Sequence, residues 1–456
     1  MLHARINLIY LAGLVRIVFV SCSGATSVPT PTIAEQLDNK IGGEIDQVNR
    51  IAYVSPNGNL FTVDPDGSGL SQLTGNLQAQ SDIPEQSFGG DIQAQPFQMN
   101  EYYTWPTWSA DGTKLAVSKV TLETDASVIS VEVMDLMTGR SETIYENGLA
   151  GLVAEGAPHY IYWAPTGDQL SFLASTPEGL SLFVWDGVTG NSPGVIDRGA
   201  PLYYQWSNDA QAMAIHLGPE IIWAKPLTED SLRESFRSLG NFRALAISPD
   251  GASLAYVDEE DSEIALYISA TNNLNQGKKL LEVGPNAAFM WSPDGTQLAV
   301  ADQSNPRVPL FDRLMLVPLD GGPVTTLTSN AGSSEVWAFF WSPAGDKLAW
   351  VSVNAQEQEL EWVVSPSDGS DNKRLFSFQP SSEVFIMLSF FDQYAYSHSP
   401  WSPDGKWLVV AGTKGKVALR NNGRTPTGDR VYVLDVEGDE RPRDLGAGVL
   451  AVWSWN

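Results

Sequence analysis

The most constraining feature of the sequence is a short phrase that recurs along most of its length. Its fullest copies, residues 291–295 and 401–405, both read Trp-Ser-Pro-Asp-Gly and precede an apolar stretch. Successive copies lie 41 to 60 residues apart and begin at Trp108, Trp163, Trp206, Ile247, Trp291, Trp341, Trp401 and Trp453. A period of this size, built from short apolar segments and turns, is typical of β-propellers with four strands in each blade.

The residues of the phrase suit a tight reversal between two strands. Ser and Asp side chains accept hydrogen bonds from nearby backbone N–H groups, Pro fixes the first corner, and Gly accepts a positive φ. The 15 Trp, 40 Gly and 28 Pro of this 456-residue chain reflect these repeats and favour an all-β protein. We expect the Trp side chains to pack between neighbouring blades.

The repeats predict an all-β fold with a single β-propeller over residues 49–456. Eight sets of strands and eight copies of the phrase predict eight four-stranded blades. Seven is the alternative, if the irregular copy at Trp206 merges with a neighbour. The set near residue 50 lacks the phrase, whereas the last copy has little else. Residues 448–455 are therefore expected to supply the innermost strand of the N-terminal blade and close the ring.

The repeats resemble the WD40-like propeller repeats of the TolB type. The first copy carries the pattern in residues 51–55 (Ile-Ala-Tyr-Val-Ser), 59–64 (Asn-Leu-Phe-Thr-Val-Asp) and 66–74, which ends in Gln-Leu-Thr. The resemblance extends from about residue 50 to the C-terminus and implies a propeller. TolB itself has an α/β domain before its propeller, of which this sequence shows nothing, so the resemblance does not extend to the Tol-Pal role.

The N-terminal segment indicates export. Residues 1–22 combine basic residues near the start with an apolar run, and residues 19–23 (Phe-Val-Ser-Cys-Ser) resemble the lipobox of bacterial lipoproteins. Lipidation of Cys22 would anchor the protein to a membrane, facing the periplasm or the cell exterior. An ordinary cleaved signal and an uncleaved anchor are the alternatives. Residues 23–48, rich in Ser, Thr and Pro, are expected to form a flexible linker.

Charge and cysteine content exclude several classes of protein. The net charge of −27 excludes a general nucleic-acid binder, because phosphate contacts need a basic surface. A single cysteine excludes a disulfide framework and multi-cysteine metal sites. The four histidines lack the close spacing typical of zinc sites, so no metal site and no cofactor are predicted. We expect a monomeric propeller that meets the membrane only through its lipid anchor.

The candidate binding face consists of long connections at one end of the propeller, where loops rather than packed strands can carry function. Aromatic residues gather at residues 75–103, 147–160 and 379–400, and basic residues at 414–430. Exposed aromatic and Arg side chains often carry binding energy at interfaces. The candidate residues are Tyr102, Tyr103, His159, Tyr160, Phe390, Tyr394, Tyr396, His398, Lys416, Arg420 and Arg424. In the alternative interpretation, the aromatic rings cover the blade ends and the basic residues are solvated.

Two classes of function follow. The favoured one is a module at the cell envelope that binds or scaffolds a protein or a glycan. The alternative is an extracytoplasmic hydrolase or lyase that gathers carboxylates around the central channel. No catalytic residue is assigned, since the one nucleophile-like pattern, Gly-Asn-Ser-Pro-Gly at residues 190–194, lies between predicted strands and not between a strand and a helix.

Overall fold

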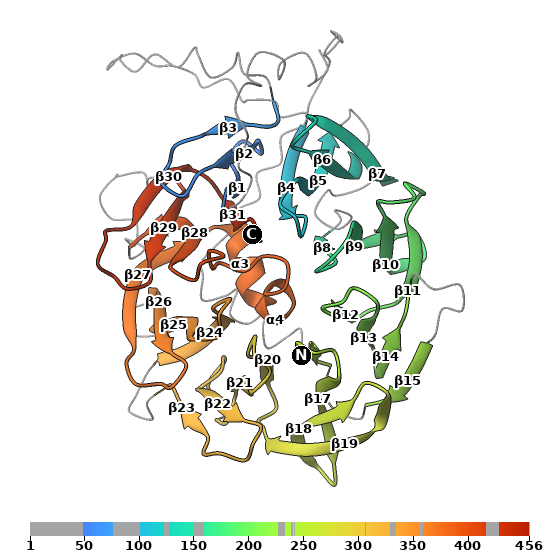
Figure 1. Cartoon of the computed structure of the whole chain (residues 1–456), viewed down its shortest axis with the longest axis vertical. Coiled ribbons are helices and arrows are strands. Elements are labelled where there is room, and N and C mark those ends of the chain that lie inside the picture. The colour runs from blue at the N-terminus through green and yellow to red at the C-terminus, as the bar shows by residue number, and fades with distance from the viewer. Residues whose placement is uncertain are drawn as a thin grey trace.

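The computed structural model describes residues 49–75, 101–122, 127–149, 159–226, 233–238, 240, 242–305, 307–328, 334–354, 359–415 and 428–455. These residues form antiparallel sheets that follow one another in chain order around a common centre (Figure 1). The radial arrangement of four-stranded sheets makes the fold an all-β propeller. The signal segment, the linker and Cys22 lie outside the described residues. No described helix is long and apolar enough to cross a membrane.

The described strands form six four-stranded sheets and one seven-stranded sheet. The four-stranded sheets are β3, β2, β1 and β31 (Ser71–Gln72, Leu60–Val63, Ile51–Val54 and Leu450–Trp453), β4 to β7 (Glu101–Trp108, Lys114–Leu122, Ser127–Asp135 and Arg140–Leu149), β8 to β11 (His159–Trp163, Gln169–Thr176, Gly179–Asp186 and Gly194–Arg198), β12 to β15 (Leu202–Trp206, Met213–Leu217, Glu220–Ala224 and Arg233–Arg237), β16 to β19 (Ala246–Ile247, Ser253–Glu260, Glu263–Ala270 and Asn273–Glu282) and β20 to β23 (Ala287–Trp291, Gln297–Asp302, Arg313–Pro318 and Thr325–Thr326). The seven-stranded sheet is β24 to β30 (Ser334–Trp341, Lys347–Asn354, Glu359–Pro366, Lys373–Pro380, Trp407–Lys414, Arg430–Asp435 and Arg443–Ala447).

The recurring phrase forms the turn between the first two strands of a sheet. Ser292 Oγ donates to Asp294 Oδ1 at 2.6 Å, and the same oxygen accepts from the Thr296 backbone N–H at 3.1 Å. Gly295 has a φ of 70°, where a side chain would be strained. Corresponding Ser–Asp bonds form at Ser109, Ser207, Ser248 and Ser402. The Ser292 hydroxyl lowers the pKa of Asp294, which keeps the carboxylate ionised as the acceptor of the turn.

Five of the described Trp side chains of the phrase donate a hydrogen bond to the backbone of a neighbouring repeat. Trp163 Nε1 donates to the Thr107 carbonyl at 3.0 Å, and Trp291 Nε1 donates to the Ala246 carbonyl at 2.9 Å. The acceptor each time is the residue just before the equivalent Trp or Ile of the preceding sheet. We call this contact the tryptophan clasp. It recurs from Trp108 to Val452, from Trp341 to Met290 and from Trp401 to Phe340. The rings are thus part of the packing between sheets, as expected.

The C-terminal strand joins the sheet that begins at residue 51. β31 pairs antiparallel with β1, with Ile51 opposite Trp453 and Val54 opposite Leu450. Ser454 and Arg50 extend this pairing, because each backbone N–H donates to the other residue, at 2.8 and 2.9 Å. The count of eight blades stays a prediction, because β27 pairs with β28 and so links strands of two predicted blades in one sheet.

The pairing of β27 with β28 has a local cause. The inner neighbour of β28 is reduced to a bridge between Trp401 and Leu408, because the chain before Pro400 is helical instead of extended. The far end of β28, from Gly412 to Lys414, instead pairs with Phe378 to Pro380 of β27.

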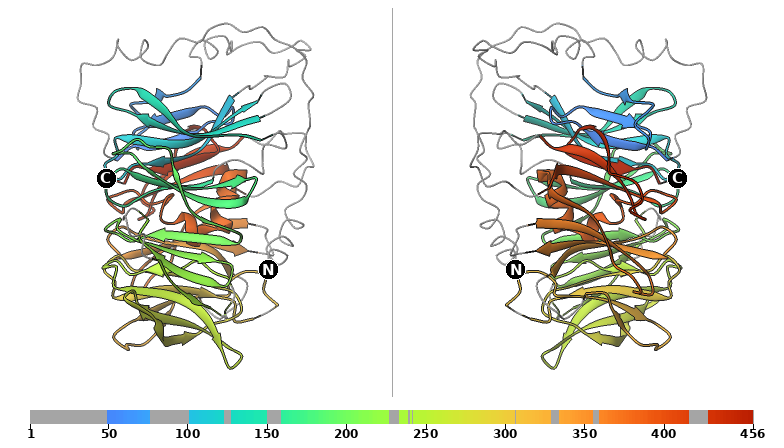
Figure 2. Two further views of the ribbon diagram at one scale, coloured as in Figure 1. Left: turned by 90° about the vertical axis from the view of Figure 1, so that its right-hand side faces the viewer. Right: turned by 90° about the vertical axis from the view of Figure 1, so that its left-hand side faces the viewer.

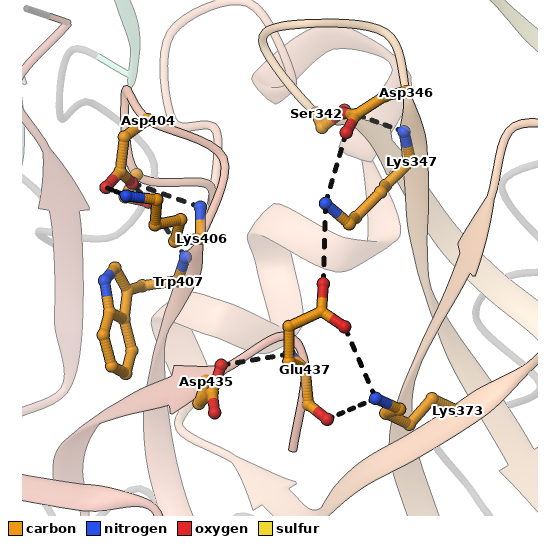
Figure 3. A network of polar contacts seen from close by, with 10 residues as sticks. Ser342, Asp346, Lys347, Lys373, Asp404, Lys406, Trp407, Asp435 and Glu437 are labelled. Carbon is orange, nitrogen blue, oxygen red and sulfur yellow. Dashed lines mark hydrogen bonds and ion pairs between the residues drawn. The ribbon is translucent and has the colours of Figure 1, made fainter. Parts of the chain in front are cut away.

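A polar network reinforces this junction at the opposite end of the strands. Glu437, in the turn between β29 and β30, lies 3.6 Å from Lys347 Nζ and 3.5 Å from Lys373 Nζ (Figure 3). These lysines belong to β25 and β27, on the other half of the seven-stranded sheet. Single exposed ion pairs contribute little to stability, but two lysines converging on one carboxylate fix the position of the turn.

Candidate functional site

Two short helices lie at the centre of the ring, α3 (Ser382–Ser389) and α4 (Phe391–Tyr394) (Figure 1). They lie toward one face of the propeller (Figure 2). Ser381 caps α3, since its side chain accepts a hydrogen bond from the Val384 backbone N–H at 3.1 Å. The Ser381 hydroxyl also donates to the Val449 carbonyl, next to β31. Sequence analysis expected a long loop in this position.

The helices fill the centre because their apolar residues face inward. Val384, Met387, Leu388 and Phe391 are buried and follow the spacing of one helical face. The Phe391 ring packs against Phe339 at 4.9 Å and against Phe311 at 6.2 Å between centroids. α4 also contacts β12, β20 and β24, which belong to three different sheets. The segment is therefore held from several sides of the ring.

Tyr394 is the centre of a second aromatic cluster on the same segment. Its ring stacks on Trp105 with centroids 4.9 Å apart and meets Tyr160 edge-on at 5.5 Å. His398 packs against both Trp105 and Tyr394. Trp105 and Tyr160 have φ values of 55° and 51°, at irregular points of β4 and β8. These β-bulges turn both rings toward the helices.

Two inner strands are locked together beneath this cluster. The Tyr160 hydroxyl donates to the Tyr204 carbonyl at 3.2 Å, and the Tyr204 hydroxyl donates to the Tyr160 carbonyl at 2.8 Å. Burial raises the pKa of both tyrosines well above the usual value, so both hydroxyls stay protonated as donors. Burial also lowers the pKa of His398 to about 3, so its imidazole is neutral near pH 7.

Three of the predicted binding residues are buried. Tyr160, Tyr394 and His398 have exposed fractions of 1 to 3%. The expectation that they are exposed to a partner is therefore wrong, because Tyr394 and His398 fold inward with the helical segment and the β-bulge in β8 turns Tyr160 toward it. Tyr396 is partly buried, and Phe390 is 37% exposed.

The other predicted residues lie apart from this cluster or outside the described part. Tyr102 and Tyr103 are half-buried on β4, and Lys119 Nζ lies 5.7 Å from the centre of the Tyr103 ring. Burial raises the pKa of Tyr103 to about 12. His159 begins β8, but its side chain is outside the described part. Lys416, Arg420 and Arg424 are outside it as well. The predicted basic cluster beside the aromatic loops therefore stays a prediction.

The exposed part of the helical segment includes a residue that sequence analysis missed. Ile386 is 42% exposed and lies four positions before Phe390, the C-cap residue of α3, which is also exposed. The helix has a signal in the sequence, because Ser381 precedes an acidic first turn and apolar residues at 384, 387, 388 and 391. We call Ile386 and Phe390 the α3 patch.

The described residues offer little for acid–base or metal chemistry. No group of three or more His, Cys, Asp or Glu side chains among them could hold a metal ion. His216, on β13, is buried, which lowers its pKa to about 4, and its Nδ1 lies 2.7 Å from the Arg243 carbonyl. This histidine is thus bound to the backbone, with Arg243 and Asp258 as the charged groups that act on it.

Comparison with known proteins places the chain by its fold. No family model and no curated protein matches it. TolB from Acinetobacter baumannii is 16% identical, over 75% of this chain and 83% of that one, with a TM-score of 0.39. A structure from a study of two prolyl endopeptidases is 12% identical, over 78% and 51%, with a TM-score of 0.50. The propeller domain of the Trilobed protease from Pyrococcus furiosus is 12% identical, over 76% and 97%, with a TM-score of 0.45. At these identities the similarity concerns the fold alone.

Proposed function

We propose that this protein is an exported, lipid-anchored propeller of eight blades that binds a protein partner at the cell envelope. The observation that carries the proposal is the α3 patch. Ile386 in α3 and Phe390, the C-cap residue of α3, are large exposed apolar residues on the segment at the centre of one face. Exposed apolar residues are common when scattered, but adjacent ones on a fixed element are typical of protein interaction sites.

The anchoring of the helices supports a binding role. Phe391 and Tyr394 hold the segment in the ring through aromatic contacts with at least three sheets. A patch held in this way loses little conformational freedom when a partner binds, so less of the binding energy is spent on ordering the surface. The protein would then present the patch at a distance from the membrane set by residues 23–48.

The same helices weigh against the hydrolase or lyase with a site in the channel. α4 occupies the centre of the ring on one face (Figure 1), and its inward residues are committed to packing. A substrate entering the channel from this face would have to displace Phe391 and Tyr394, both buried. Among the described residues, no contact supports a hydrolase or lyase site in the channel over a protein-binding surface.

Site-specific crosslinking tests the binding role. A photo-crosslinking amino acid placed at Ile386 or Phe390 in the full chain should yield the same covalent adduct with a cell-envelope protein. Val188 is 76% exposed, in the turn between β10 and β11, and is the control position. The proposal fails if positions 386 and 390 give no adduct, or if position 188 gives the same one.

Lipid anchoring is tested separately with Cys22→Ser. The wild-type protein should sediment with membranes, and the variant should be released into the soluble fraction because the site of acylation is gone. A variant that stays in the membrane fraction would contradict the lipid anchor without affecting the proposed role of the α3 patch.

A further inference from the structure

A groove of about 750 Å³ lies between two neighbouring sheets, β16–β19 and β20–β23. It opens at the turns of the recurring phrase, away from α3 and α4, and is independent of the α3 patch. Its volume is within the range of sites for small organic ligands, roughly 300 to 1,000 Å³. Its lining comes from both sheets and their turns and includes Asp250, Lys278, Leu280, Trp291, Asp294 and Leu319.

Trp291 gives the groove an aromatic wall. The Trp residues of the other copies are buried, whereas Trp291 is partly exposed. Its indole N–H is already bonded to the Ala246 carbonyl, which fixes the orientation of the ring before any ligand arrives. Leu280 and Leu319 pack beside it as partly buried residues. The groove therefore has a fixed apolar floor that solvent can reach.

The outer strand of the first sheet, which contributes to the groove, is irregular. The pairing of β18 with β19 shifts register twice, between Leu266 and Tyr267 and again between Ile268 and Ala270. β19 brings two exposed lysines to the groove, Lys278 and Lys279. The Lys279 ammonium is held by Glu263 and Glu282, each at 2.8 Å.

The rim of the groove carries both hydrogen-bond acceptors and a hydrogen-bond donor. Asp250 and Asp294 accept hydrogen bonds within their own turns, from Ser248 Oγ at 2.5 Å and Ser292 Oγ at 2.6 Å. Asp250 accepts through Oδ1, which leaves its Oδ2 for a ligand, whereas Asp294 Oδ2 already accepts from Thr296 Oγ1 at 2.9 Å. The hydroxyls lower the pKa of both carboxyl groups. Lys278 adds a donor on the opposite side of the groove.

We infer that this groove binds a short uncharged glycan. A sugar ring presents an apolar C–H face and a rim of hydroxyls that both donate and accept. An oriented indole, carboxylate acceptors and an ammonium donor match those two features together. The mixed charges of the rim disfavour a strongly charged ligand, because carboxylates and ammonium groups would repel either sign.

Saturation-transfer NMR tests this site with two probes, cellotetraose and chitotetraose, and with tetra-alanine as the peptide comparison. At least one tetrasaccharide should bind the full-length wild type at millimolar concentration, with saturation strongest on ring C–H protons. Asp250→Ala should weaken binding about tenfold, the loss of one hydrogen bond to a charged group. Asp404→Ala changes the same position of another turn, outside the groove, and should leave binding unchanged.

A second pair of variants distinguishes an effect of Trp291 on sugar binding from an effect on the stability of the protein. Trp291→Phe should weaken sugar binding, whereas Trp401→Phe removes a clasp of the same kind elsewhere and should not. The inference is overturned if neither tetrasaccharide binds, if tetra-alanine binds instead, or if Asp250→Ala and Asp404→Ala have equal effects. None of these results bears on the α3 patch.

Discussion

At the scale of single residues, the tryptophan clasp explains why an indole recurs in this sequence. A Phe would fill similar space, but only the indole N–H reaches the carbonyl of the preceding sheet. At two copies of the phrase, a different hydrogen bond replaces the tryptophan clasp. Trp206 donates to Ser171 Oγ, which donates in turn to the Tyr162 carbonyl. Where Ile247 replaces Trp, its backbone N–H donates to Gln205 Oε1.

Trp453 offers a test of what the clasp contributes. It is as buried as Trp163, yet its Nε1 finds no hydrogen-bond acceptor among the described residues. Trp163→Phe and Trp453→Phe remove the same volume, but only Trp163→Phe also leaves a carbonyl without its indole donor. We expect Trp163→Phe to lower the free energy of unfolding by about 1 kcal/mol more than Trp453→Phe. Urea unfolding measures the difference, and equal losses would show that the clasp contributes nothing beyond packing.

Because His398 is buried, we expect the protein to lose stability in mild acid. Burial lowers its pKa from 6.5 to about 3, so the unfolded chain binds a proton in this range that the native protein does not. This contribution to stability is complete above about pH 6.5 and falls as the pH drops toward the native pKa. Between pH 7.5 and 5 the loss should be about 2 kcal/mol.

His398→Phe keeps an aromatic ring beside Trp105 and Tyr394 and cannot titrate. Urea unfolding of the variant should therefore show a smaller loss over the same interval. Both proteins share His216 and all carboxyl groups, so those contributions cancel in the comparison. An identical pH dependence in the two proteins would contradict the assignment to His398.

At the scale of elements, sequence analysis succeeds where the repeat dictates structure and fails where the chain departs from it. The Ser–Asp turns and the inter-sheet Trp packing follow from the phrase itself. The segment 379–400 was expected to be a loop because its aromatic residues were considered as surface groups. Its helical spacing was present in the sequence, but the burial of Tyr394 depends on Trp105 and Tyr160, which distant β-bulges aim at it.

The junction between β27 and β28 depends on one glycine. Gly412 has a φ of 152°, and a Cβ placed there would lie 2.1 Å from the Gln379 carbonyl oxygen. Gly412→Ala must therefore push the strands apart. Gly218→Ala is the control, because Gly218 also has a positive φ but faces open space. We expect the melting temperature to fall more for Gly412→Ala, and hydrogen exchange at β28 to increase only in that variant.

At the scale of the whole molecule, the net negative charge accompanies two proposed binding sites, the α3 patch and the groove. A net charge of −27 keeps an apolar patch and an aromatic groove soluble on one propeller. The α3 patch and the groove lie toward opposite ends of the strands, so two ligands could bind at once. The ring would act as a rigid spacer between them, which fits a scaffolding module better than an enzyme with a single channel site.

That rigidity depends on the C-terminal strand. Leu450, Val452 and Trp453 are buried, and the Val452 carbonyl accepts the indole N–H of Trp108 from the next sheet at 3.3 Å. Deleting residues 448–456 would expose an edge of β1 and remove that acceptor. We expect the truncated protein to unfold at a lower temperature, and a synthetic peptide of residues 448–456 to restore part of the stability by adding the missing strand.

The same peptide with Val452 and Leu450 both changed to Asp is the control, because buried carboxylates cannot replace these side chains. Rescue by the native peptide alone would show that β31 acts as a strand that holds the ring together. If the deletion leaves the unfolding temperature unchanged, the sheets are stable without this pairing, and the ring is held by the contacts between sheets, the tryptophan clasps foremost among them.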